Sequence, residues 1–87
     1  MYDRLALTVD DLEYRTAGND VIVHDPLTER VHVLNATAAY ILRACDGKRS
    51  AAAIAHDLSA RTGVSSARTL PDVERALAQF SELHLIR

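Results

Sequence analysis

The residues that could support metal binding, acid–base chemistry or nucleophilic attack are few and scattered along the chain. His24 and His32 lie on strands that we expect to pair, so the two rings can lie close together, but no third ligand stands at a suitable spacing. His56 and His84 stand alone on expected helices, with no orienting partner for acid–base catalysis. Cys45 falls at the C-terminal end of an expected helix, on its apolar face, whereas reactive thiols favour helix N-termini or cationic neighbours. We therefore expect no metal, no cofactor and no catalytic residue.

The motifs that usually carry enzyme chemistry are also absent from the sequence. It has no glycine-rich phosphate loop, no serine or cysteine nucleophile elbow and no cluster of carboxylates. A chain of 87 residues also has little room to enclose a substrate pocket. The sequence therefore predicts a protein that is not an enzyme.

Length and composition predict one small domain over residues 1–87, with a core over about 12–86. The net charge is −2 with acids and bases interspersed, so we expect neither nucleic acid nor a membrane as a partner. A single cysteine excludes an internal disulfide, which favours a cytoplasmic location. No apolar stretch is as long as a membrane-spanning helix. The first ten residues also lack the apolar run of a signal peptide.

The first half of the chain is predicted to form strands. Residues 12–16, 21–24 and 30–34 are the strand candidates, and the second is a run of β-branched residues. Residues 17–20 contain Gly18 and Asn19, which tolerate the backbone of a tight hairpin, and Pro26 ends the second strand. These signals predict an antiparallel hairpin that the first strand extends to a small meander.

The second half is predicted to form three helices, over residues 36–45, 51–61 and 70–83. Asn35 and Ser50 are expected N-caps, and Gly47 and Gly63 are expected to end the first two helices in the left-handed conformation. Residues 63–68 are expected to form a polar loop. After it, Thr69 and Asp72 resemble a capping box, and Pro71 fits the first turn of a helix.

The last helix has a wide apolar stripe, spanning about 140° of its circumference. A stripe of this width implies that the helix either contacts two surfaces or leaves part of its apolar face at the lip of a cleft. Its members are Leu70, Val73, Ala76, Leu77, Phe80, Leu83 and His84. Strands followed by helices predict an α+β fold in which a three-stranded antiparallel sheet packs on three helices.

A sheet this small must have edges, and an exposed edge strand offers unpaired N–H and C=O groups to another chain. If residues 30–34 form that edge, their alternate side chains would face a groove against the last helix, a common site for binding an extended peptide. The alternative is an ordinary structural strand.

Taken together, these pieces resemble the PqqD family, whose domain is also called the RiPP recognition element, after the ribosomally made and modified peptides it serves. The resemblance covers about residues 21–86. It rests on Leu34-Asn35-Ala36-Thr37-Ala38, Ile41-Leu42, Cys45-Asp46-Gly47, Ile54 and Leu58, then Val73, Leu77, Phe80 and Leu83 before Leu85-Ile86. It implies a winged helix-turn-helix-like fold and a non-catalytic chaperone that binds the leader segment of a precursor peptide.

In that family the leader adds as a strand beside the third strand and lies next to the third helix. The resemblance thus implies a peptide-binding site at Arg30, Val31, His32, Val33, Leu34, Val73, Ala76, Leu77 and Phe80. It also implies a partner enzyme, either a radical SAM enzyme in pyrroloquinoline quinone (PQQ) pathways or a leader peptidase in lasso-peptide pathways. The segment before the hairpin and the loop before the last helix can alter the partner surface, which leaves the pathway open.

Two other functions remain as alternatives. A winged-helix DNA-binding regulator would use the last helix for recognition, but the exposed positions of that helix carry three acids and one base, which phosphates would repel. A scaffold subunit would use the same free edge to pair with a second copy of itself.

Overall fold

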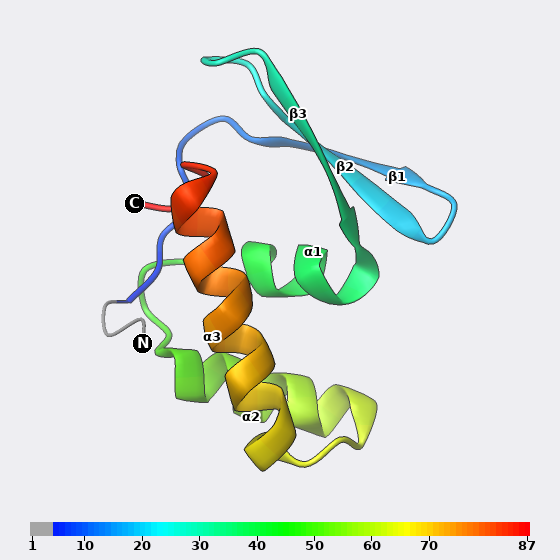
Figure 1. The fold of residues 1–87 in the computed structure, drawn as a ribbon, viewed down its shortest axis with the longest axis vertical. Helices are drawn as coiled ribbons and strands as arrows, with labels where there is room; N and C mark the ends of the chain where they lie inside the picture. The colour runs from blue at the N-terminus through cyan, green and yellow to red at the C-terminus, as the bar shows by residue number, and fades with distance from the viewer. Residues whose placement is uncertain (1–4) are drawn as a thin grey trace.

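The computed structural model describes residues 5–87, in which three strands precede three helices (Figure 1). The elements are β1 (Glu13–Ala17), β2 (Asp20–Asp25), β3 (Arg30–Asn35), α1 (Ala36–Arg43), α2 (Ala51–Thr62) and α3 (Ser66–Glu82). The strands form one antiparallel sheet in the order β1-β2-β3. The predicted α+β class, with the sheet on one side and the helices on the other, is confirmed.

The β1–β2 hairpin forms where turn chemistry predicted it. Ala17 pairs with Asp20, and Gly18 between them has φ +63°, a conformation that costs glycine little. The observed β1 lies one residue later than predicted, and β2 is one residue longer at each end. Successive side chains alternate between the two faces, so Val23 and Leu34 are buried against the helices whereas Val33 is exposed.

The starts of α1 and α2 are also as predicted. The side chain of Asn35 accepts a hydrogen bond from the backbone N–H of Ala38 at 2.8 Å, and Ser50 accepts one from Ala53 at 3.1 Å. Gly63, with φ +77°, ends α2. Each cap satisfies a backbone group that the helix leaves without a partner.

The end of α1 differs from the prediction. The helix ends at Arg43 with Ala44 as its C-cap, so Gly47 lies beyond it in the following loop. The reason is tertiary: the N–H of Gly47 donates to the carbonyl of Ala6 at 2.8 Å, and a Cβ on Gly47 would lie 3.4 Å from the Leu7 side chain. Residues 6–8 therefore pack into the fold, and Thr8 bridges to Ile86 near the C-terminus.

The start of α3 is the largest error of the sequence analysis. The helix begins at Ser66, inside the expected polar loop, and Pro71 is its sixth residue rather than part of its first turn. Thr69 does not cap the helix. It is buried, and its hydroxyl donates to the carbonyl of Ala55 in α2 at 2.9 Å. This bond to a neighbouring helix explains why a polar residue lies in the α2–α3 interface.

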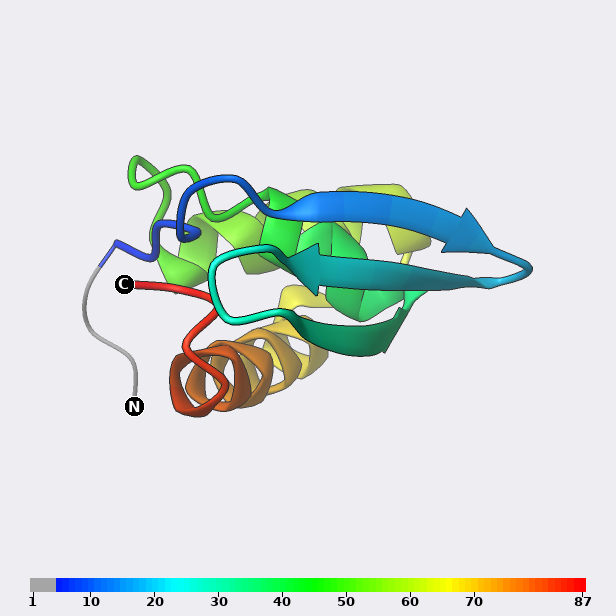
Figure 2. The ribbon, with the colours of Figure 1, turned by 90° about the horizontal axis from the view of Figure 1, so that it is seen from above.

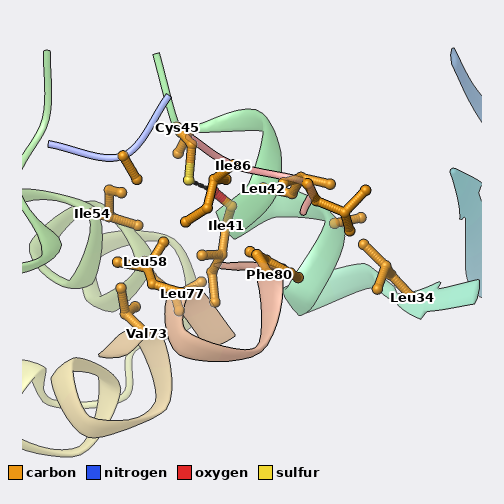
Figure 3. Close-up of a cluster of buried hydrophobic side chains, with 14 of the residues drawn as sticks. Leu34, Ile41, Leu42, Cys45, Ile54, Leu58, Val73, Leu77, Phe80 and Ile86 are labelled. Carbon is orange, nitrogen blue, oxygen red and sulfur yellow. Dashed lines mark hydrogen bonds between the residues drawn. The ribbon is translucent and has the colours of Figure 1, made fainter. Parts of the chain in front are cut away.

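The core is aliphatic with one large aromatic ring, as the composition indicates. Figure 3 shows side chains of α1, α2 and α3 gathered in one cluster, with Phe80 between Leu77 and Leu34 in this view. Phe80, Ile41 and Leu77 are at most 2% exposed. No helix within residues 5–87 combines the length and the apolar character needed to cross a bilayer.

Candidate functional site

Strand β3 lies at the edge of the sheet. It pairs with β2 on one side, and no strand of the described residues pairs with its other side. Viewed from above, β1 and β3 form the two long edges, and α3 lies on the β3 side (Figure 2). Residues 30–34, for which the sequence left the edge position open, therefore lie at a free edge of the sheet.

The hairpin register determines which way the peptide groups of each strand point. Only two residues separate Ala17 from Asp20, so this pair exchanges backbone hydrogen bonds and Asp20 turns its N–H and C=O toward β1. Because the direction alternates along a strand, Ile22 and His24 also face β1. Val21, Val23 and Asp25 must then face β3.

The register between β2 and β3 determines which backbone groups of β3 point to the free edge. Val21, Val23 and Asp25 lie opposite Leu34, His32 and Arg30, in that order, so those three β3 residues direct their peptide groups to β2. Val31 and Val33 direct their N–H and C=O groups outward. No backbone hydrogen bond to either residue exists elsewhere in residues 5–87. The edge thus offers two donors and two acceptors in the spacing of a β-ladder.

Apolar side chains accompany these free peptide groups. Val31 and Val33 are 59% and 65% exposed, and Leu27 in the β2–β3 loop is 75% exposed. A hollow of about 500 Å³ lies on the outer face of the sheet, with Val31 and Ile22 among its lining residues. This outer face was not predicted as part of the site, although strict alternation along residues 30–34 could have indicated it.

The α3 residues predicted for the site differ in how far their side chains are exposed. Val73, Leu77 and Phe80 are 0–1% exposed, so their side chains pack in the core and offer no surface to a ligand. Ala76 is half-buried, as are Leu70 and Leu83, which also lie on the rim of the stripe. The width of the apolar stripe indicated that some of its residues lie at a rim, but it could not show which of them pack in the core. Tertiary packing decides it, since the centre faces α1 and α2.

The histidines do not form a cluster. In the sheet register Val23, not His24, lies opposite His32, so the two histidines are on opposite faces of the sheet. The expectation that they can lie close together is wrong. His24 instead hydrogen-bonds through Nδ1 to the Glu13 carboxylate at 2.8 Å. The described part of the chain contains no group of three or more His, Cys, Asp or Glu residues arranged for a metal ion.

Cys45 is buried, as predicted, and its Sγ donates a hydrogen bond to the Ile41 carbonyl at 3.2 Å. Burial, followed by the nearby charge of Asp46, raises the pKa of the Cys45 thiol to about 12. The thiol is thus protonated at neutral pH and is a poor nucleophile.

The surface of α3 is not that of a DNA-reading helix. Arg75 is neutralised by Asp72, which it contacts at 2.6 Å, and Glu74 and Glu82 add negative charge. Arg68 is the remaining base of the helix. Phosphate neutralisation needs an excess of such bases, so the alternative of a DNA-binding regulator gains no support here.

A protein-family model matches most of the chain. The family model described as coenzyme PQQ synthesis protein D (PqqD) matches residues 20–86, from β2 to the C-terminal segment. The chain belongs to the PqqD family. No curated protein sequence matches this PqqD-family chain at a significant level.

Two solved structures share the fold of this PqqD-family chain. "Lasso peptide synthetase B1 complexed with the leader peptide" has a TM-score of 0.77 at 17% identity, covering 95% of this chain and 98% of that one. "TbiB1 in Complex with the TbiA(beta) Leader Peptide" has a TM-score of 0.76 at 15% identity, covering 93% and 94%. At these identities the likeness shows the fold. Its coverage extends beyond the part of the chain that the family model matches.

Proposed function

We propose that this PqqD-family chain binds the leader segment of a ribosomally made precursor peptide, which adds as a strand to β3. The single observation that carries the proposal is the outward direction of the Val31 and Val33 peptide groups at an uncovered edge. The two solved structures of the same fold, each described as a complex with a leader peptide, support it. The chain's part is to hold the peptide for an enzyme, a leader peptidase or a radical SAM enzyme, and not to react with it.

Backbone pairing alone gives too little affinity for this task. Two N–H and two C=O groups form four hydrogen bonds, each worth about 0.5–1.5 kcal/mol, or about 2–6 kcal/mol together. A micromolar complex needs about 8 kcal/mol, and ordering a flexible peptide adds a cost. Buried side chains must supply the difference. The exposed Val31, Val33 and Leu27 are the apolar surface available for this beside the edge.

The proposed contact residues follow from the two faces of β3. Val31 and Val33 contact the bound strand on the outer face, whereas Arg30, His32 and Leu34 lie on the face turned toward the helices. From α3 we retain Ala76 as a direct contact, because it keeps exposed surface. Val73, Leu77 and Phe80 support the site from the core by holding α3 in place.

Amide hydrogen exchange of the isotope-labelled chain tests the proposal, with and without a synthetic leader of the precursor peptide encoded beside its gene. In the free chain, the amides of Val31 and Val33 should exchange rapidly, and those of His32 and Leu34 slowly. Adding peptide should protect Val31 and Val33 selectively. A peptide that binds without protecting these two amides would show that strand addition at β3 is wrong.

A scaffold that pairs with itself would use the same edge, so the mass of the chain in solution separates the two functions. Light scattering of the free chain should give a monomer. A dimer that dissociates when leader peptide is added would mean that self-pairing competes for β3. A dimer unaffected by peptide, with no leader binding, would favour the scaffold.

A further inference from the structure

A row of stacked arginine and tyrosine side chains runs from β1 across α1 to α2. The Arg43 guanidinium lies over the Tyr14 ring, 4.6 Å from its centroid, and Arg61 lies over the Tyr40 ring at 4.7 Å. Tyr40 and Arg43 are three residues apart on α1 and so share one side of that helix. We call these four residues the arginine–tyrosine surface.

The two arginines have no acidic partner within residues 5–87. The carboxylates nearest in sequence, Asp46 and Asp57, both bind Arg49, at 3.6 Å and 3.1 Å. Arg43 and Arg61 are exposed, and each stacks on a tyrosine ring without an ion pair within residues 5–87. Stacking fixes the guanidinium planes while their N–H groups remain available to an acceptor from outside.

Positive charge is concentrated in the part of the chain that contains α1 and α2. Residues 36–63 carry four Lys and Arg against two Asp, although the whole chain has a net charge of −2. The α1–α2 segment, residues 36–63, is therefore positive and the rest of the chain negative. Such a separation gives a docking surface its polarity, because it attracts an acidic partner to one face only.

The arginine–tyrosine surface lies away from the proposed leader site. Figure 2 shows β3 and α3 along one side of the molecule, and β1 with α2 along the other. The elements that carry the surface are β1, α1 and α2. A partner bound there would leave the β3 edge open to peptide.

We propose that the arginine–tyrosine surface docks an acidic patch on a protein partner, namely the enzyme that acts on the peptide held at β3. This identification of the partner rests on the proposed function. Tyrosine and arginine are the residue types enriched at the energetic centres of protein interfaces, and here the arginines are already ordered by stacking. Asp and Glu side chains match the planar fork of each free guanidinium.

A nucleic acid is the other polyanion that arginines bind, but the surroundings disfavour it. Only two unpaired guanidinium groups stack in the row, and Asp46 and Asp57 lie on the same half of the chain. A phosphate backbone would require several neutralised contacts, and the chain as a whole repels it. A protein patch with a few carboxylates matches the number of arginines present.

The test uses the purified leader peptidase or radical SAM enzyme encoded beside the gene, titrated with the full chain by calorimetry at low and moderate salt. Wild type should bind, and less tightly as salt rises. The double variant R43E/R61E should bind the enzyme more than about tenfold more weakly, because like charges then face each other. Its affinity for the synthetic leader should equal that of wild type, and the variant should remain folded, with a thermal midpoint lowered only by the loss of the two stacking contacts.

R15E/R68E is the matched control, because both of its arginines are exposed, lack ion pairs in the described chain and change the net charge equally. It should bind the enzyme as wild type does. R43K/R61K keeps the charge and should bind between wild type and R43E/R61E. Equal weakening by the control, unchanged binding by R43E/R61E, no enzyme binding by wild type, or binding of an RNA oligonucleotide with the same arginine dependence would each overturn the proposal. Leader affinity, measured separately, shows whether the proposed function stands.

Discussion

Val33→Pro removes one of the two backbone N–H donors that β3 offers to an added strand. The N–H of Val33 points away from β2, so proline at this position removes no hydrogen bond of the sheet. The Val33 side chain is 65% exposed, so little packing is lost either. The variant should therefore fold, while its edge loses a donor and gains a ring where the peptide backbone would lie.

The magnitude follows from what the bound peptide loses. One backbone hydrogen bond contributes about 0.5–1.5 kcal/mol, and leaving the peptide's carbonyl buried without a partner costs about 1–3 kcal/mol. A loss of about 1.5–4.5 kcal/mol corresponds to leader binding that is roughly 10- to 2000-fold weaker. The change in the free energy of unfolding should be much smaller than the change in binding.

Fluorescence anisotropy of a labelled leader peptide measures the first quantity, and urea denaturation followed by circular dichroism measures the second. Thr16→Pro is the matched control, because the register turns the N–H of Thr16 outward at the opposite edge, on β1. It should bind leader as wild type does. Wild-type affinity in a folded Val33→Pro variant would refute strand addition at β3, and so would equal weakening by Thr16→Pro.

Three further predictions concern stability, each measured by urea denaturation. Thr69→Val removes the buried bond to the Ala55 carbonyl and should lower the free energy of unfolding by about 1 kcal/mol. Asn35→Ala removes the α1 cap and should cost about 0.5–2 kcal/mol. The fold raises the pKa of Cys45 from 9.0 to about 12, so the stability due to the protonated thiol is present below pH 9 and is lost as pH rises toward 12. At pH 10 the wild type should have lost about 1.4 kcal/mol that Cys45→Ala retains.

The controls for Thr69→Val and Asn35→Ala are substitutions at exposed positions, and the comparison for Cys45→Ala is the pH profile of the wild type. Thr16→Val changes an exposed threonine and should leave stability nearly unchanged, as should Thr37→Ala beside the α1 cap. Equal losses in Thr69→Val and Thr16→Val would contradict a role for the buried bond. Parallel pH profiles of wild type and Cys45→Ala above pH 9 would contradict the perturbed thiol.

The elements that could be predicted were those with local chemical signals. Asn35 and Ser50 cap their helices through their own side chains, and Gly18 and Gly63 adopt positive φ, as the sequence indicated. These signals act within three or four residues, so no knowledge of the fold is needed to use them. The family resemblance also came from the order of such local pieces, and the family match confirmed it.

The signals that failed were those that depend on a neighbour distant in sequence. Thr69 looked like a cap but lies inside α3, where its hydroxyl bonds to α2. Gly47 looked like a helix stop but receives the segment around Ala6 and Leu7. A threonine near a proline or a glycine after a helix has several local interpretations, and only the packed partner selects one.

The candidate site shows the same division. Alternation of side chains identified residues 30–34 as a strand, but an isolated sequence cannot state which strand is outermost. The two-residue turn at Gly18 sets the register, and the register turns the peptide groups of Val31 and Val33 outward. The apolar stripe of α3 was visible in the sequence, yet packing against two helices decided that Val73, Leu77 and Phe80 lie in the core.

The sequence by itself determined the order of strands and helices and the capped starts of α1 and α2, because each depends on residues close together in the chain. Tertiary structure decided which edge is free, which way its hydrogen-bonding groups point and which arginines have no acidic partner among residues 5–87. Those properties depend on which segments pack side by side, and packing is a property of the whole fold.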